Sequence, residues 1–128
     1  MNMTLSEDLE TLRAEVRRFC QDVVPEDIKT KVKTERFSLC ADDQKSIAKL
    51  LYEEGGWSCP GWPEEWGGPG WSYPEQYLFE RELSLGDAPR INQFGAGMLG
   101  PALMEFGTEE QKQRFLPPIV RGDVLWCQ

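Results

Sequence analysis

The feature that most constrains this chain is the stretch Gly55–Trp71, which is crowded with glycine, proline and tryptophan. It reads GGWSCPGWPEEWGGPGW and holds six of the twelve glycines, three of the nine prolines and four of the five tryptophans. Glycine is entropically costly in regular elements and proline lacks the backbone N–H, so this stretch cannot continue a helix or a central strand. Its indoles favour burial because water solvates their large apolar surface poorly. The sequence predicts a long loop pinned to a hydrophobic surface, and loops of this length are often functional.

Length and charge narrow the class of protein. With 128 residues the chain is most simply one domain, large enough to bury a core without disulfide or metal staples. The net charge of −8 argues against nucleic acid as a partner, since phosphate binding needs a basic surface. No apolar run approaches the ~20 residues of a membrane span, and the acidic N-terminus does not resemble a signal peptide. We therefore expect a cytoplasmic protein without a membrane span.

The cysteines and the lack of histidine limit the chemistry. Cys20, Cys40, Cys59 and Cys127 are widely spaced and form no CxxC pair, and the chain contains no histidine. We therefore expect reduced thiols and no metal site. The absence of histidine also removes the commonest general base and the usual partner of a nucleophilic serine or cysteine.

Hydrophobic periodicity predicts helices on both sides of the loop. The first spans Thr4 to about Val24, where apolar residues recur at spacings of three and four, and Thr4 with Glu7 fits a capping box. Pro25 ends this helix. The charged stretch 26–39 is only weakly patterned, so it is interpreted as an irregular connection with a solvated surface.

Two further helices flank the loop directly. The helix at 42–54 has two leading aspartates, either of which can cap it, and a Gly-Gly pair ends it. The helix at 72–85 begins with a capping box of Ser72 and Glu75 and is apolar on more than one side, which indicates a largely buried helix. Its central Glu80–Glu82 segment is interpreted as a solvated face, with a buried Glu–Arg pair as the alternative.

The fourth helical segment, Arg90–Phe106, has unusual composition. It carries Gly95, Gly97 and Gly100, each of which costs about 0.8–1 kcal/mol relative to alanine inside a helix. Small residues at these positions indicate that something approaches the backbone closely, either another packed element or a bound ligand. A kink is expected at Pro101.

The last helix begins with a capping box of Thr108 and Gln111, and it is expected to be interrupted or kinked near Pro117–Pro118. The chain then changes character at Val124–Cys127, a short apolar run typical of a strand. A single strand cannot satisfy its own backbone.

Several local motifs, in this order, resemble the N-terminal helical domain of acyl-CoA dehydrogenases. The matching segments are PEEWGGPG at 63–70, EREL at 80–83, FGTEEQK at 106–112, Leu116-Pro117 and Gly122. The first and third motifs are specific only as a pair, and the resemblance covers essentially the whole chain. It implies an all-α bundle of about five helices over 1–123, with the strand-like 124–128 as the start of a middle β domain.

The resemblance also implies a function. Enzymes of that family use FAD to oxidise the Cα–Cβ bond of an acyl-CoA thioester: a glutamate removes the α-proton and the β-hydrogen leaves as hydride to the flavin. Those groups belong to later domains, so no catalytic residue is expected in this chain. The resemblance implies Gln128 as a flavin-contacting residue and Ile91, Phe94 and Met98 as substrate-binding residues on a wall of the acyl cavity. Electron-transfer flavoprotein or a similar acceptor is the implied redox partner.

Two other interpretations stay open at this point: a stand-alone helical binding or assembly module, and the same domain of an acyl-CoA oxidase or a flavin monooxygenase. Under the dehydrogenase interpretation, the isolated chain is expected to be inactive and not to retain FAD. It is also expected to self-associate through the Trp-rich loop and Val124–Cys127. The resemblance favours a structural role for the loop tryptophans over contact with substrate.

Overall fold

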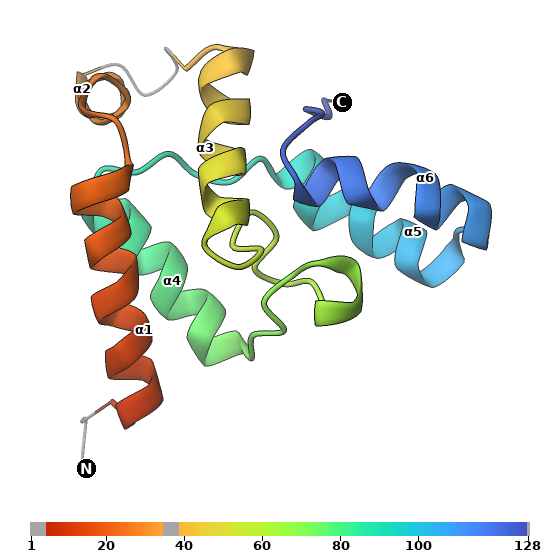
Figure 1. Ribbon diagram of the computed structural model, residues 1–128, viewed down its shortest axis with the longest axis horizontal. Helices are drawn as coiled ribbons and strands as arrows, with labels where there is room; N and C mark the ends of the chain where they lie inside the picture. Colours follow the sequence, from red (N-terminus) through yellow and green to blue (C-terminus); the bar gives the residue numbers. More distant parts are fainter. Residues whose placement is uncertain (1–4, 35–38, 128) are drawn as a thin grey trace.

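The computed structural model describes residues 5–34 and 39–127, and these residues form helices and loops without a β-strand. The helices are α1 (Glu7–Arg18), α2 (Glu26–Thr34), α3 (Ala41–Glu53), α4 (Tyr73–Leu85), α5 (Gly100–Phe106) and α6 (Glu109–Val120). Figure 1 shows α1 to α4 gathered in one part of the molecule and α5 with α6 side by side in another. The all-α prediction is confirmed, with α2 as a helix that the sequence did not reveal.

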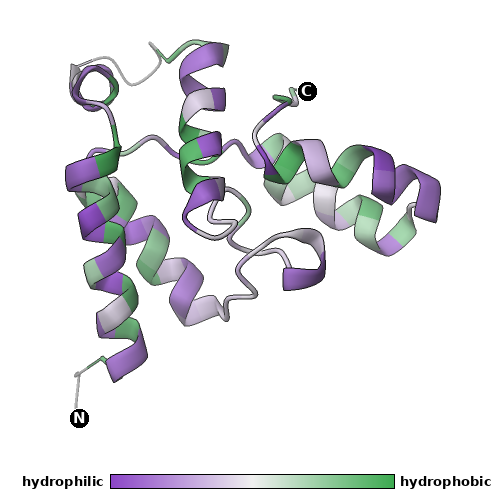
Figure 2. Cartoon of the chain, viewed as in Figure 1, coloured by the Kyte–Doolittle hydropathy of each residue, from purple (hydrophilic) through white to green (hydrophobic). Residues whose placement is uncertain are grey.

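Helix α1 is the outer helix that covers α4. The side chain of Ser6 caps it by accepting a hydrogen bond from the backbone N–H of Leu9 at 3.4 Å; the predicted cap, Thr4, lies outside the described residues. The helix continues as a short π-helix, η1 (Phe19–Val23). Figure 2 shows both hydrophilic and hydrophobic residues along α1, and its apolar face, with Val16 fully buried, packs on α4.

The expected irregular connection after Pro25 is instead helix α2, so that prediction is wrong. The backbone N–H of Lys29 donates to the carbonyl of Pro25, and the hydroxyl of Thr30 donates to the carbonyl four residues before it. Only Ile28 is buried on this helix. A single buried position on a short helix leaves no apolar period in the sequence, which explains why the pattern did not reveal it.

Helix α3 begins one residue earlier than predicted, because Cys40 rather than an aspartate is its N-cap. Asp43 lies at the third helical position, where its carboxylate accepts the backbone N–H of Cys40 at 3.1 Å. The same carboxylate accepts the ammonium of Lys31 on α2 at 2.8 Å. The hydrogen bond from Lys31, followed by those from Cys40, lowers the pKa of Asp43. This ion pair connects α2 to α3.

The other two predicted capping boxes are confirmed. The carboxylate of Glu75 accepts the backbone N–H of Ser72 at 2.7 Å. At the start of α6, the backbone N–H of Thr108 donates to Gln111 at 2.9 Å, and the Thr108 hydroxyl accepts in return at 3.2 Å. Both helix starts are therefore determined by local sequence, since the two residues of each box satisfy each other's free N–H.

The centre of α4 carries a buried ion cluster instead of the solvated face favoured by the sequence. Glu82 is only 1% exposed. Its carboxylate accepts one hydrogen bond from the guanidinium group of Arg17 on α1 and one from that of Arg81, each at 2.7 Å. The two arginines reach it from the rim and stay half-exposed. The alternative of a buried Glu–Arg pair is thus correct, because α1 covers this side of α4.

The Trp-rich loop joins two hydrophobic cores. The first core contains Leu12, Val16, Phe19, Cys20, Val24, Ile28, Ile47, Leu51, Trp57, Leu78, Phe79, Leu83 and Ala88. The second core contains Cys59, Trp62, Leu116, Ile119 and Val120. Trp57 is one of the buried residues of the first core, with its ring 5.6 Å from that of Phe79, whereas Trp62 belongs to the second. Buried tryptophans therefore pin the loop into both cores, in line with the predicted loop pinned to a hydrophobic surface.

Helix α6 runs without a break through Pro117 and Pro118, so the predicted interruption is wrong. The two prolines remove the donors for the carbonyls of Gln113 and Arg114, and both of those residues are exposed. Carbonyls on an exposed face can accept from water, so the helix tolerates the loss. Residues 124–127 follow without regular secondary structure, and the described chain provides no neighbouring strand for them.

Candidate functional site

The segment predicted as one helix over Arg90–Phe106 is made of two helices of different type. It begins at about Gln93 and forms a π-helix, η3 (Phe94–Leu99), before α5. The side-chain oxygen of Asn92 accepts the backbone N–H of Phe94 at 3.0 Å, which fixes the start of the segment after 90–92. The segment changes from π to α geometry between Leu99 and Gly100, next to Pro101. Helices of the π type are rare and are frequent at functional sites.

The structure brings together two of the three predicted substrate-binding residues. Phe94 and Met98 lie about one turn apart on η3 and are 39% and 53% exposed. Ile91 lies before the helix, is half-buried and packs against the first core. Phe94 and Met98 therefore form an outward-facing apolar pair, named here the apolar wall, whereas Ile91 belongs to the side of the segment that faces the domain.

At two of the glycines in this segment, side chains from other parts of the chain occupy the space that a Cβ would fill. A Cβ built on Gly95 would lie 3.2 Å from Ile119 and 3.3 Å from Trp126. A Cβ built on Gly100 would overlap the indole ring of Trp62. Of the two alternatives left by the sequence, packing therefore explains both positions.

Gly97 differs from these two glycines because it lies on the rim of a cleft. A Cβ at Gly97 would meet only the end of the flexible Gln93 side chain. The cleft has a volume of about 580 Å³ and lies between the Trp-rich loop, α4 and η3. Its lining includes Trp62, Trp71, Tyr73, Gln76, Glu80, Ile91, Gln93 and Gly97.

A second cleft of about 420 Å³ adjoins the first and shares Glu80, Ile91 and Gln93 with it. Of the three residues predicted to bind substrate, only Ile91 lines these clefts. The spacing of Tyr73, Gln76 and Glu80 along α4, at three and then four residues, marks one face of the helix and was the available signal. What the spacing could not supply is the loop that folds over this face.

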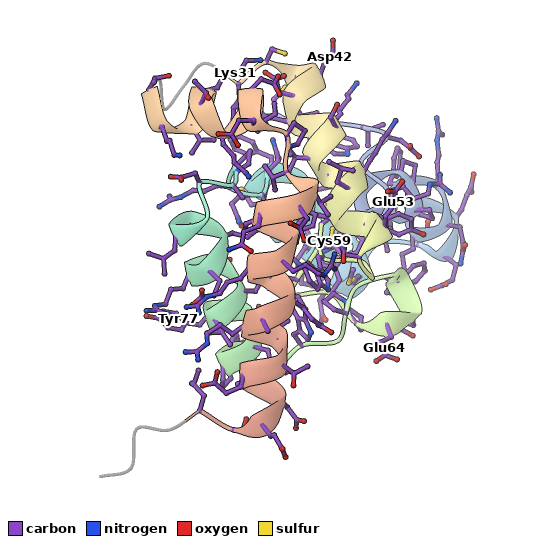
Figure 3. All side chains as sticks on the ribbon, turned by 60° about the vertical axis from the view of Figure 1, so that its left-hand side comes forward. Lys31, Asp42, Glu53, Cys59, Glu64 and Tyr77 are labelled. Carbon is purple, nitrogen blue, oxygen red and sulfur yellow. The ribbon has the colours of Figure 1, made fainter. Side chains whose placement is uncertain are left out.

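The titratable groups of the site region do not form a proton-transfer pair. Burial raises the pKa of Cys59 to about 12 and that of Cys20 to about 11, so both thiols stay protonated at neutral pH. Glu82 is occupied by its two arginines. Figure 3 shows Cys59 inside the molecule and Tyr77 at its periphery, in line with exposures of 1% and 71%. These residues supply packing and surface rather than acid–base chemistry.

Cofactor and metal positions were also compared with the structure. Within residues 5–34 and 39–127, no group of histidine, cysteine, aspartate and glutamate side chains could hold a metal ion. Gln128, the predicted flavin contact, lies outside the described residues. Close to it, the indole N–H of Trp126 is buried without a hydrogen-bond partner in the described chain. One unpaired donor does not make a flavin site, so the described residues alone do not fit FAD.

The expectation of exposed apolar patches at the Trp-rich loop and at Val124–Cys127 holds only in part. Trp57 and Trp62 are 6% and 2% exposed because each is buried in one of the two cores, whereas Trp66 and Trp71 are half-buried. Large exposed apolar side chains include Val124 and also lie at Tyr52, Tyr73, Tyr77, Leu85, Phe94, Met98 and Phe106. Among the described helices, none is long and apolar enough to span a membrane.

Fold and site together define a helical domain in which an exposed apolar pair on η3 lies beside two clefts. The family model of the acyl-CoA dehydrogenase N-terminal domain matches residues 6–123. The chain therefore belongs to the acyl-CoA dehydrogenase family and corresponds to its N-terminal domain.

Individual relatives agree with this assignment. Acyl-CoA dehydrogenase IpdE1 of Mycobacterium tuberculosis is 49% identical over 74 residues, which is 57% of this chain and 19% of the relative. The crystal structure of the ChsE4-ChsE5 complex from Mycobacterium tuberculosis matches with a TM-score of 0.78 and 27% identity, over 97% of this chain and 30% of that one. The Tcur3481-Tcur3483 steroid ACAD matches with a TM-score of 0.73 and 35% identity, over 98% of this chain and 32% of that one. The chain thus spans between about a fifth and a third of the length of these proteins.

Proposed function

We propose that this chain is the N-terminal domain of an FAD-dependent enzyme that dehydrogenates acyl-CoA thioesters between Cα and Cβ. Its own contribution is one wall of the acyl cavity, formed by Phe94 and Met98. The observation that carries the proposal is this exposed apolar pair within a segment that belongs to the family domain. The catalytic base and the flavin-binding groups are then supplied outside residues 1–123, with Gln128 as the first flavin contact.

The apolar wall fits an acyl group better than a polar ligand. Exposed phenylalanine and methionine side chains are costly in water, and an acyl chain that covers them removes that cost. Methionine is also flexible and fits apolar partners of irregular shape. We therefore assign to the wall the part of the substrate that lies away from the CoA group.

For the substrate class, we propose an acyl-CoA thioester with a bulky steroid-derived acyl group. This part of the proposal is supported by the 35% identity to the Tcur3481-Tcur3483 steroid ACAD over 98% of the chain. A competing short-chain substrate would bury little of the wall, and a chain as short as butyryl removes only a few CH₂ groups from water at ~0.8 kcal/mol each.

Substitution of the wall tests the proposal. In the enzyme that contains this domain, Phe94→Ala and Met98→Ala are expected to raise the KM for a steroid acyl-CoA roughly tenfold each, with kcat little changed, because they remove uniform binding of an apolar group. Phe106→Ala is the matched control, since Phe106 is 85% exposed and lies on α5 beyond the wall. Unchanged KM values in both wall variants would contradict the proposal.

The partners of the enzyme are part of the same proposal. Electron-transfer flavoprotein or a similar acceptor would reoxidise the flavin, and an oxidase would instead release hydrogen peroxide, which a peroxidase-coupled assay detects. We further propose that the isolated chain self-associates through its exposed apolar side chains, which lie on η3, α4 and α5 and at Val124. A monomer in light scattering at high concentration contradicts that part, and flavin absorbance in the purified chain contradicts its expected lack of FAD.

A further inference from the structure

The backbone carbonyl of Ala96 lies where η3 changes into α5, and it loses both of its helical donors there. In an α-helix it would accept the N–H of Gly100, but that N–H donates to the carbonyl of Gly95 instead. In a continued π-helix it would accept from residue 101, which is proline and has no N–H. A carbonyl in this position needs a donor from elsewhere, because an unpaired and partly buried carbonyl is costly.

The Trp-rich loop supplies that donor. The indole N–H of Trp62 donates to the carbonyl of Ala96 at 2.7 Å, across 34 residues of sequence. Trp62 is only 2% exposed, so its ring is held by the surrounding second core. The loop tryptophan thus replaces the hydrogen bond that Pro101 removes.

The ring reaches this carbonyl only because residue 100 is glycine. A Cβ at Gly100 would overlap the six-membered ring of Trp62, as noted above. Trp62, Gly100 and Pro101 therefore depend on one another. Pro101 has no N–H to donate to the Ala96 carbonyl, Gly100 has no side chain to block the indole ring, and the indole N–H of Trp62 donates the hydrogen bond.

This bond lies inside the turn that sets the direction of the apolar wall. Ala96 is located between Phe94 and Met98 on η3. A π-helical turn holds about one residue more than an α-helical turn, so conversion of η3 to α geometry would rotate Phe94, at its start, by up to about 100° relative to α5, and Met98, near its end, by much less. The two side chains would then no longer lie together on one outward-facing surface. The helix type of η3 therefore determines how Phe94 and Met98 are directed relative to each other.

We propose that Trp62 is a positioning residue for the acyl wall: its indole N–H holds η3 in the π-helical register that presents Phe94 and Met98 to the substrate. The inference rests on the proposed function of that wall. Trp62 itself does not touch the acyl group in this proposal. It acts through the Ala96 carbonyl, and it thereby affects which acyl groups bind well.

A double-mutant cycle on the 128-residue chain tests the bond itself. Trp62→Phe keeps most of the ring and removes the N–H, and it is expected to lower the folding equilibrium constant roughly tenfold. Pro101→Ala restores a backbone N–H that can reach the Ala96 carbonyl in the π register. In the Trp62→Phe background it is expected to recover most of that loss, whereas alone it has a small effect. Additive effects of the two substitutions would overturn the role of the hydrogen bond.

Trp71→Phe is the matched control for the cycle. Trp71 belongs to the same loop and packs on Phe79 with ring centroids 5.0 Å apart. In the described chain its indole N–H has no hydrogen-bond acceptor. Its substitution is expected to leave the folding constant unchanged within about twofold. An equal loss in Trp62→Phe and Trp71→Phe would show that ring size, not the N–H, matters.

The second arm measures the wall in the enzyme that contains this domain. Trp62→Phe is expected to raise the KM for a steroid acyl-CoA about fivefold and to leave the KM for butyryl-CoA and both kcat values nearly unchanged. Pro101→Ala in the same background is expected to restore the KM. If Phe94→Ala raises KM but Trp62→Phe does not, the positioning role is overturned and the proposed function stands. If Phe94→Ala and Met98→Ala both leave KM unchanged, the proposed function fails, whatever the unfolding cycle gives.

Discussion

The two hydrophobic cores of this domain are built in different ways. The first buries thirteen residues, mostly large aliphatic and aromatic side chains from α1 to α4. The second buries five, and it relies on close approaches between a loop tryptophan, glycines of η3 and α5, and the proline-containing helix α6. Amphipathic helices need only an apolar face to pack together, whereas the second core needs specific side chains to fit into specific gaps.

In the proposed function, the first core mainly stabilises the domain, whereas the second core supports the residues that contact substrate. In the first core, α1 covers the carboxylate of Glu82, although α4 also carries the exposed side chains of Tyr73, Tyr77 and Leu85. The second core leaves Phe94 and Met98 exposed on the segment that it holds. In the proposed function the apolar wall needs a rigid support behind it, and we propose that the contacts of Trp62 supply this support.

The largest expected effect comes from a truncation in the first core. Phe79 is fully buried, and Phe79→Ala is expected to lower the free energy of unfolding by about 4 kcal/mol, because it leaves a cavity that the core cannot fill. Urea unfolding measures the loss. Phe106→Ala, at an 85% exposed position, is expected to change stability by less than ~0.5 kcal/mol. Equal effects of the two substitutions would show that the first core is not the main source of stability.

A pair of glycine substitutions tests the fitted contacts of the second core. Gly100→Ala is expected to cost about 2 kcal/mol, since its methyl group overlaps the ring of Trp62. Gly97→Ala meets only the end of Gln93, so it is expected to be neutral or to stabilise the helix by up to ~0.8 kcal/mol. Thermal or urea unfolding of both variants gives the comparison. A stable Gly100→Ala variant would contradict the close packing of the loop on α5.

The smallest expected effect is on the pH dependence of stability. It compares the two cores through the buried thiol that each contains, Cys20 in the first and Cys59 in the second. Folding raises the pKa of Cys20 to about 11 and that of Cys59 to about 12, so the folded state keeps a proton that the unfolded state loses above the ordinary thiol pKa of 9.0. Stability should therefore fall as pH rises from about 9 towards these values, by about 1 kcal/mol per thiol between pH 8 and pH 10.

Urea unfolding at the two pH values measures this slope. Cys59→Ala is expected to remove the contribution of the second core to this slope, and Cys20→Ala is expected to remove that of the first core. Cys40→Ala, at an exposed thiol, is the control for the loss of a cysteine as such. If the slope survives in both buried-thiol variants, the thiols do not cause it, and the two cores cannot be compared in this way.

Local signals in the sequence predicted much of the fold. The capping boxes at Ser72 and Thr108 are present as expected because each involves residues three apart on one helix. Helix α2 was missed because Ile28 alone is buried on it. The buried state of Glu82 was considered but not favoured, since only the position of α1 places Arg17 over it. Interactions between distant segments leave no period in the sequence.

The candidate site was predictable only in part. The glycines of the fourth segment and the apolar residues between them pointed to η3, and Phe94 with Met98 do form one exposed surface. The clefts beside α4 were not predicted, because they depend on how η3 and the residues before it fold back against α4. The direction of the wall was also out of reach, since it depends on a π-helical turn.

The Trp-rich stretch shows which features follow from the sequence alone and which require the tertiary structure. Its composition alone determined that it is a loop and that its indoles are pins, because glycine and proline exclude regular structure and water solvates indole poorly. Only the tertiary structure decided which core each indole enters, and that Trp62 donates to the carbonyl left free by Pro101. The physical reason is that burial is a property of a residue type, whereas a hydrogen bond requires two distant atoms to meet within about 3 Å.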